Sequence, residues 1–167
     1  GCGKTTLFSI CIGEQNIDGG KIFLNNKSIE EIPIHLRSKE GLGYLPQQRS
    51  VFDMSVYDNI LGIAQISIKD AENQKLVTEK LLDEFNLQHL RSLNASVLSG
   101  GVIRRLMMDR VMIKKPKIVL LDEPLAALDP IVIQDIQKYI MKIQATGTAV
   151  LITDHNVKNL FLSLIHI

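Results

Sequence analysis

The sequence predicts an α/β fold in which a mostly parallel sheet is interrupted by a helical segment. Two apolar runs, "KIVLLDEP" at 117–124 and "TAVLITDH" at 148–155, each end in polar residues. Buried parallel strands have this pattern, with the polar residues at the carboxyl edge of the sheet, where ligands bind. The stretch 55–113, which precedes both runs, carries helix signals instead. Strands that alternate with helices favour parallel pairing, so we expect one sheet with a helical insertion.

The composition indicates a folded chain and excludes several kinds of partner. Of the 167 residues 46% are apolar, and 19 Lys and Arg stand against 18 Asp and Glu. A core can therefore be buried, and no basic block indicates nucleic acid or anionic lipid as a direct partner. No signal peptide is visible, and no apolar stretch approaches the ~18 residues that span a bilayer, so we expect membrane contact only through partners. Cys2 and Cys11 are too far apart for a disulfide, which fits a reducing cytoplasm.

The first part of the chain predicts a helix followed by a hairpin. Residues 4–12 favour a short helix that Gly13 ends. The segment "GGKIFLNNKSI" at 19–29 then alternates apolar and polar residues around Asn25 and Asn26. This pair is typical of a tight hairpin turn.

A short helix and a strand come next. Pro33 can open a helix that ends at Gly41. The run "LGYLP" at 42–46 then predicts a buried strand, which delivers Gln47 and Gln48 to a loop.

Helix signals dominate the middle of the chain. Ser55 can cap a helix starting at Val56, and Asp70 can cap one over 71–85. The residues "SGG" at 99–101 precede a Met-rich apolar segment that we expect to be helical core. After Pro130, isoleucines recur at helical spacing, at Ile133, Ile136, Ile140 and Ile143.

The first six residues, "GCGKTT", match the second half of the phosphate-binding pattern G-x-x-x-x-G-K-[ST]. Backbone N–H groups at such a helix start surround a phosphate. In this pattern Lys4 meets the outer phosphates and Thr5 ligates magnesium. The candidate nucleotide-binding residues here are Gly1, Cys2, Gly3, Lys4, Thr5 and Thr6. Since only half of the motif is present, a simple tight turn is the alternative.

The run "IVLLDEP" at 118–124 supplies two carboxylates at a predicted strand end. Asp122 can hold magnesium through water while Glu123 polarises an attacking water, as catalytic base. The alternative is that Asp-Glu-Pro only ends the strand and caps the next helix.

The tetrapeptide "LSGG" at 98–101 predicts a second phosphate site. Ser99, Gly100 and Gly101 stand at a helix start, where N–H groups and a hydroxyl can bind phosphate. One subunit already has its phosphate site at Lys4, so this one would act on the nucleotide of another copy, in a homodimer. As a bare tetrapeptide it would be a loop.

In order and spacing these motifs resemble the nucleotide-binding domain of the ATP-binding cassette (ABC) transporters, over residues 1–161. Gln47 in "YLPQ", "ALDP" at 127–130 and "ITDHN" at 152–156 extend the likeness. The resemblance implies a P-loop NTPase (RecA-like) core over 1–46 and 114–161, with a partial N-terminal β-subdomain. It implies a Gln-loop and helical signature subdomain over 47–113.

The resemblance also implies roles for single residues. Gln47 would join Thr5 and Asp122 at Mg²⁺ and couple to transmembrane permease subunits, which would dock near Phe52–Tyr57. His155 would contact the γ-phosphate of ATP as a second catalytic residue, in keeping with its place just beyond a strand. Asp129 would act across the dimer. The implied protein is an ATPase coupled to transport, on the cytoplasmic face of the inner membrane.

Within the family, "GYLPQ", "SVYDN", "LDEPLAALDP" and "VLITDHNV" most resemble the ATPase subunit of the lipopolysaccharide transport (Lpt) system. ATPases of branched-chain amino-acid importers share much of this and stay open as an alternative. A catalytically impaired ABC binding module is another.

The sequence departs from the family pattern at several places. Val102 stands where the family has Gln or Glu, and Asp109 stands where a small residue is usual. Asp109 must either pair with a neighbour such as Arg105 or Arg110, or cost stability. The chain begins within the phosphate loop, and residues 162–167 leave the family pattern, so we expect a fragment with a non-native tail.

Overall fold

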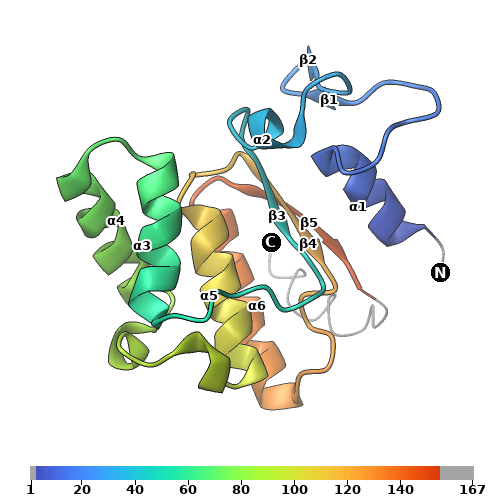
Figure 1. The fold of residues 1–167 in the computed structure, drawn as a ribbon. Coiled ribbons are helices and arrows are strands. Elements are labelled where there is room, and N and C mark those ends of the chain that lie inside the picture. Colours follow the sequence, from blue (N-terminus) through green and yellow to red (C-terminus); the bar gives the residue numbers. More distant parts are fainter. Residues whose placement is uncertain (1–2, 155–167) are drawn as a thin grey trace.

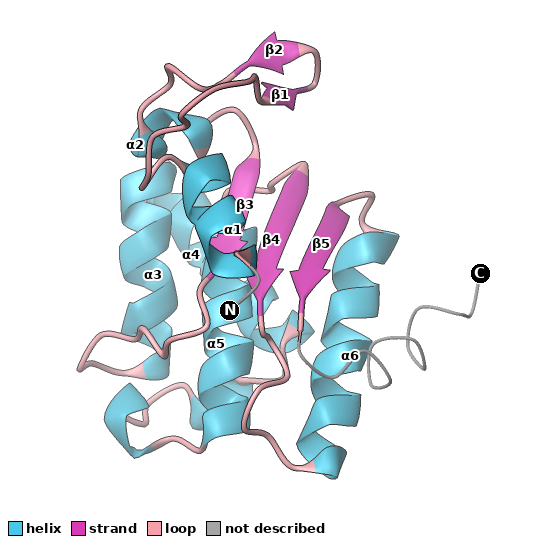
Figure 2. Ribbon diagram, turned by 90° about the vertical axis from the view of Figure 1, so that its right-hand side faces the viewer, coloured by secondary structure: helices cyan, strands magenta, loops and turns pink. Residues whose placement is uncertain are grey.

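The centre of the molecule is a parallel sheet, as predicted. The computed structural model describes residues 3–154. Strands β3 (Leu42–Leu45), β4 (Ile118–Asp122) and β5 (Ala149–Thr153) pair in parallel in the order β3-β4-β5. Figure 2 shows the three strands running in one direction, so that their carboxyl ends share one edge.

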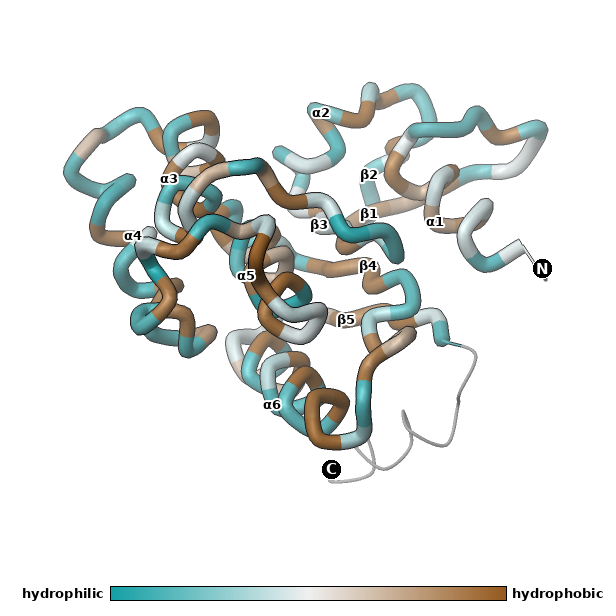
Figure 3. The backbone as a smooth tube through the Cα atoms, turned by 60° about the horizontal axis from the view of Figure 1, so that its bottom comes forward, coloured by the Kyte–Doolittle hydropathy of each residue, from teal (hydrophilic) through white to brown (hydrophobic). Residues whose placement is uncertain are grey.

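Helices cover both faces of this sheet. Helix α1 (Lys4–Ile12) lies on one face, and α5 (Gly100–Met112) and α6 (Pro130–Ala145) lie on the other (Figure 1). Strand β4, which is apolar up to its last residue, Asp122 (Figure 3), packs against both layers. Its Leu120 packs in a cluster with Phe8 of α1, whereas Val119 and Leu121 belong to the larger core on the side of α5 and α6.

The middle of the chain forms the predicted helices. Helices α3 (Val56–Ser67) and α4 (Ala71–Glu84) start at the caps that the sequence predicts, because Ser55 and Asp70 each accept a backbone N–H with their side chain. Two 3₁₀ turns, Gln88–Leu90 and Ala95–Val97, lead to α5.

This helical part has no separate core. Val56, Leu82 and Leu106 belong to the same buried cluster as Val119 and Leu121 of the sheet. The boundaries predicted for a helical subdomain remain a prediction.

The predicted hairpin is confirmed. Strands β1 (Phe23–Leu24) and β2 (Lys27–Ser28) are antiparallel, and Asn25 and Asn26 connect them at φ of 50° and 63°. Two successive residues with positive φ form the turn whose twist suits a two-residue hairpin, and Asn tolerates that backbone.

Two expectations were wrong in detail. Helix α2 (Ile34–Arg37) follows Pro33 but ends at Arg37, before Gly41. The buried guanidinium of Arg37 turns back instead and donates to four carbonyl oxygens, on Ile10, Cys11, Glu30 and Ile32. Strand β5 forms as predicted but is less buried than its apolar sequence indicates. Its Leu151 pairs with Leu120 and so faces the same side of the sheet as α1, but it is 46% exposed and is not part of the cluster in which Phe8 of α1 packs on Leu120.

Candidate functional site

The carboxyl edge of the sheet gathers the candidate residues. Strand β4 ends at Asp122, which is fully buried, and β5 ends beside it at Thr153. The Thr153 hydroxyl donates to Asp122 Oδ1 at 2.6 Å, and the Glu123 backbone N–H donates to the Thr153 carbonyl at 2.8 Å. Figure 2 shows that the first turn of α1 lies at this same edge. Lys4, Thr5, Asp122 and Glu123 are therefore at one end of the sheet, as the sequence predicts.

Asp122 has an oxygen to offer to a cation. Its Oδ2 is buried and accepts no hydrogen bond from residues 3–154. Burial raises the pKa of the nearby Tyr44 to about 12, with the charge of Asp122 as the next cause. A buried carboxylate oxygen without a partner is costly unless a ligand approaches it. Asp122 is therefore suited to hold a hard cation.

The donor set fits magnesium rather than a metal held by protein alone. No group of three or more His, Cys, Asp or Glu that could hold a metal occurs in the part of the chain that the structure describes. Magnesium is commonly held by one or two carboxylates together with substrate phosphates and water. The Asp122 carboxylate, the Thr5 hydroxyl and the Gln47 amide oxygen are ligands of the required kind.

Glu123 is in direct contact with Gln47. Gln47 Nε2, on the loop after β3, donates to Glu123 Oε2 at 2.8 Å. Glu123 is 7% exposed and adopts φ of 47°. This left-handed backbone is unusual for a residue with a side chain and is found preferentially at functional sites. The sequence placed Gln47 at magnesium and did not predict this bond.

Helix α1 begins at a residue that cannot cap it. Gly3 occupies the N-cap position at φ of 79° and has no side chain with which to cap the first turn. Thr5 and Thr6 are exposed there and Lys4 is half-buried. Uncapped N–H groups with the positive end of the helix dipole make this an anion-binding end. Gly1 and Cys2 lie outside the described residues.

The second predicted phosphate site, at the start of α5, has a similar construction. Ser99 occupies the N-cap position and is exposed, yet its hydroxyl makes no capping bond. A Cβ on Gly101 would lie 2.4 Å from Val132 Cγ1, so a larger residue there would have to displace the Val132 side chain on α6. Because α5 and α1 lie on opposite faces of the sheet (Figure 1), their first turns do not converge on one ligand.

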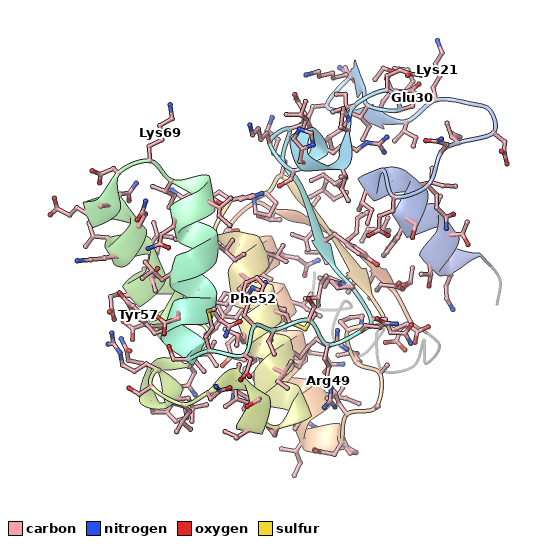
Figure 4. The ribbon with its side chains drawn as sticks, in the orientation of Figure 1. Lys21, Glu30, Arg49, Phe52, Tyr57 and Lys69 are labelled. Carbon is pink, nitrogen blue, oxygen red and sulfur yellow. The ribbon has the colours of Figure 1, made fainter. Side chains whose placement is uncertain are left out.

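Two arginines of α5 hold the loop that carries Gln47. Arg104 donates to the carbonyl oxygens of Pro46 at 3.0 Å and Gln47 at 3.2 Å. Arg110 donates to the Ser50 carbonyl at 2.7 Å and lies 4.3 Å from the ring centre of Phe52. Figure 4 shows Phe52 in front of α5 and Arg49 at the end where α5 and α6 begin. Sequence reasoning missed both contacts, since nothing in "IRRLMMDRVM" separates these arginines from exposed ones.

A family model described as "ABC transporter" matches residues 1–126. The chain belongs to the ABC transporter family. This confirms the family that the motifs indicate and the P-loop ATPase fold class that goes with it.

Relatives and solved structures agree with this assignment. The chain is 42% identical over 160 residues to the lipopolysaccharide export system ATP-binding protein LptB of Escherichia coli K12, and 41% over 161 residues to LptB of Haemophilus influenzae. Each match covers 95% of this chain and 66% of the relative, just under two thirds of its length.

Two solved structures share the fold. One is cbiO1 from Clostridium perfringens, part of the ABC transporter complex cbiONQ, with a TM-score of 0.86 and 27% identity over 96% of this chain and 66% of that one. The other is the ADP conformation of the ATP-binding cassette MJ1267, with a TM-score of 0.81 and 26% identity over 96% and 69%.

Other residues of this ABC domain have local roles or lie outside the description. Asp129 Oδ1 accepts the Val132 N–H at 3.1 Å and so caps α6. This neither tests nor contradicts its predicted action across a dimer. His155 falls outside residues 3–154. Within that range no helix is long and apolar enough to cross a membrane.

The two departures from the ABC pattern are both on α5. Val102 is half-buried and packs against the main core. Asp109 is fully buried, and neither of its carboxylate oxygens has a hydrogen-bond partner in the described chain. Arg105 and Arg110 donate elsewhere, so the pairing that was one alternative is wrong. Burial, and secondarily the charge of Glu84, raise the Asp109 pKa well above its ordinary value.

Proposed function

We propose that the protein binds and hydrolyses ATP as the nucleotide-binding subunit of a bacterial ABC transporter. The observation that carries this proposal is the arrangement at the carboxyl edge of the sheet. There the start of α1, which its N-cap glycine cannot cap, lies at the same edge of the sheet as the end of β4, which carries the buried Oδ2 of Asp122 and is followed by Glu123. These are an anion site, a cation ligand and a base, which phosphoryl transfer to water requires.

Each residue then has a chemical task. The N–H groups of α1 and the Lys4 ammonium would hold the β- and γ-phosphates of ATP. Asp122, Thr5 and Gln47 would hold Mg²⁺, which would neutralise charge on the phosphate oxygens. Glu123 would accept a proton from the attacking water, and Gln47 is positioned to orient that carboxylate through its hydrogen bond. His155 would contact the γ-phosphate.

A homodimer supplies the rest of the site. Since α5 begins on the face of the sheet opposite α1, Ser99, Gly100 and Gly101 would contact the nucleotide of a second copy. Two copies would enclose two ATP molecules, with Asp129 acting near the shared interface. The exposure of Ser99 and its unused hydroxyl support this arrangement.

Permease subunits would dock beside the Gln47 loop. A cleft of about 320 Å³ lies between β3 and α5, and its lining includes Tyr44, Ser50, Ile63 and Arg110. The segment Phe52–Tyr57 comes shortly after Ser50 in the sequence. A permease segment bound in this cleft would contact Ser50. Ser50 and Gln47 both accept hydrogen bonds from α5, and Gln47 also donates to Glu123, so a movement of this loop would be transmitted to Glu123. The protein would thus lie in the cytoplasm, on the inner face of the membrane, and contact the membrane only through these partners.

We further infer that the transported substrate is lipopolysaccharide, moved from the inner membrane. The LptB relatives at 41–42% identity support this, and no observation favours an amino-acid importer. The test is replacement of LptB in a depletion strain of E. coli by the full-length protein. Growth that depends on Glu123 supports the proposal. If the strain fails to grow while the protein retains magnesium-dependent ATPase activity in vitro, the proposal of ATP hydrolysis stands and the proposal that lipopolysaccharide is the substrate is overturned.

A further inference from the structure

A second cavity lies at the opposite edge of the sheet from the candidate nucleotide site. It measures about 670 Å³, is open to solvent on one side, and is lined by α4, the end of α5, the end of α6 and the residues that precede β4 and β5. Small-molecule sites in proteins commonly measure about 300–1,000 Å³. The nucleotide, dimer and permease contacts proposed above do not use this cavity.

The inner wall of this cavity is apolar and aromatic. Leu81 and Phe85 of α4 line it together with Tyr139 and Ile143 of α6, and only a small part of each of these four residues is exposed. The rings of Phe85 and Tyr139 stack, with centres 5.4 Å apart and planes inclined by 15°. Such a wall favours an apolar ligand body, because each buried methylene contributes about 0.8 kcal/mol.

The rim of the cavity is positively charged. Four lysines line it, Lys80, Lys115, Lys117 and Lys142, with Glu84 as the single acidic residue in the lining. Glu84 pairs with Lys80 at 3.5 Å. Lys142 lies 5.1 Å from the Tyr139 ring centre and 3.4 Å from the Glu84 carbonyl oxygen, which keeps its ammonium beside the aromatic wall. Lys115 and Lys117 form no side-chain hydrogen bond or ion pair with residues 3–154.

We propose that this cavity binds a small amphiphilic anion, a carboxylate or a phosphate monoester with an extended apolar body. The apolar wall between α4 and α6 takes the body, and Lys115, Lys117 and Lys142 take the head group. A cationic amphiphile of the same length is repelled by the rim, and a simple inorganic anion gains nothing from the wall. The site does not overlap the proposed ATP site, since it lies at the other edge of the sheet.

The test is calorimetric titration of the full-length protein with dodecanoate, below the concentration at which it forms micelles. We expect saturable binding at one site, and decanoate about 15-fold weaker, since two methylenes at about fourfold each are lost. Dodecyl phosphate in a parallel titration shows which head group is preferred. Dodecyltrimethylammonium and inorganic phosphate are expected to bind at least tenfold more weakly than dodecanoate.

Matched lysine variants locate the site. Lys115→Gln and Lys142→Gln should each weaken dodecanoate about two- to fivefold, the range for exposed ion pairs, and the double variant about tenfold. Lys138→Gln, on α6 but outside the cavity, should bind like the parent. The proposal is overturned by absence of dodecanoate binding, by equal binding of the cationic amphiphile, or by an equal effect of Lys138→Gln.

Discussion

Gln47 Nε2 donates to Glu123 Oε2 at 2.8 Å and so joins the loop after β3 to the residue after β4. The backbone of Gln47 is held in turn by Arg104 of α5, at 3.2 Å. Three elements distant in the sequence thereby meet at the proposed catalytic base. A displacement of the loop, such as a docked permease would cause, must lengthen or break the bond to Glu123. The bond is therefore a physical link between the proposed docking cleft and the proposed chemistry.

Glu123→Gln tests the base directly. An amide cannot accept the proton of the attacking water, so we expect kcat to fall by about 10²–10⁴-fold, the usual contribution of a general base. ATP affinity should remain, since Gln retains the size of Glu and an oxygen that can accept from Gln47. Phosphate release and nucleotide titration on the full-length protein measure the two quantities. Near-parental turnover would remove Glu123 from the role of base.

Gln47→Ala tests the link, with Gln48→Ala as its matched control. Gln48 is adjacent and exposed, and its side chain makes no hydrogen bond with residues 3–154. Loss of the Gln47 amide leaves Glu123 without one of its orienting contacts and removes a proposed magnesium ligand. We expect kcat to fall about tenfold or more in Gln47→Ala and the magnesium concentration for half-maximal activity to rise. An equal, small effect of both variants would show that Gln47 has no special role.

The local features of this fold were predictable because each depends on residues close in the chain. Ser55 and Asp70 cap α3 and α4, and Asn25-Asn26 closes the hairpin, through bonds and backbone preferences that span a few residues. The carboxyl edge was predictable for a similar reason. Polar residues that follow apolar runs must leave a parallel sheet together.

Contacts between distant segments were not predictable in the same way. The bond from Gln47 to Glu123 spans 76 residues, and the one from Arg104 to Pro46 spans 58. Such contacts depend on rotamers and on the packing of α5 against the loop, which periodicity does not report. The bonds of the Arg37 side chain to carbonyl groups on α1 and on the chain before Pro33 have the same origin.

Gly101→Ala should disturb the start of α5, and Gly100→Ala is its control. A Cβ at Gly101 would lie 2.4 Å from Val132 on α6, which is packed and cannot easily retreat. At Gly100 the nearest atom is the end of the flexible Arg49 side chain, at 2.5 Å. We expect Gly101→Ala to lower the free energy of unfolding by about 1–3 kcal/mol, a typical cost of overpacking. Gly100→Ala should change it by under about 1 kcal/mol, because Arg49 can move. Urea unfolding of both variants provides the comparison, and equal losses would contradict it.

Asp109 should destabilise the native state increasingly as pH rises. Burial raises its pKa in the folded protein, whereas in the unfolded chain it titrates near the ordinary value of about 3.9. Below that pH both states hold the proton, and no penalty arises. Above it the unfolded state releases the proton first, so the unfolded state binds fewer protons and stability falls with pH, by at most about 1.4 kcal/mol per pH unit. The fall ends once pH passes the raised folded pKa.

Asp109→Ala should remove this pH dependence and stabilise the protein at neutral pH. The change deletes a buried carboxyl whose two oxygens have no hydrogen-bond partner in the described chain, so we expect a gain of about 1–3 kcal/mol at pH 7 and a much smaller one at pH 4. Alanine also favours a helix over aspartate by up to about 0.7 kcal/mol, independently of pH. Asp135→Ala, on the exposed face of α6, controls for that term and for the loss of a surface charge. Urea unfolding at several pH values measures the difference between the two variants. A gain for Asp109→Ala that stays constant from pH 4 to pH 7 would show that Asp109 is not held neutral by the core.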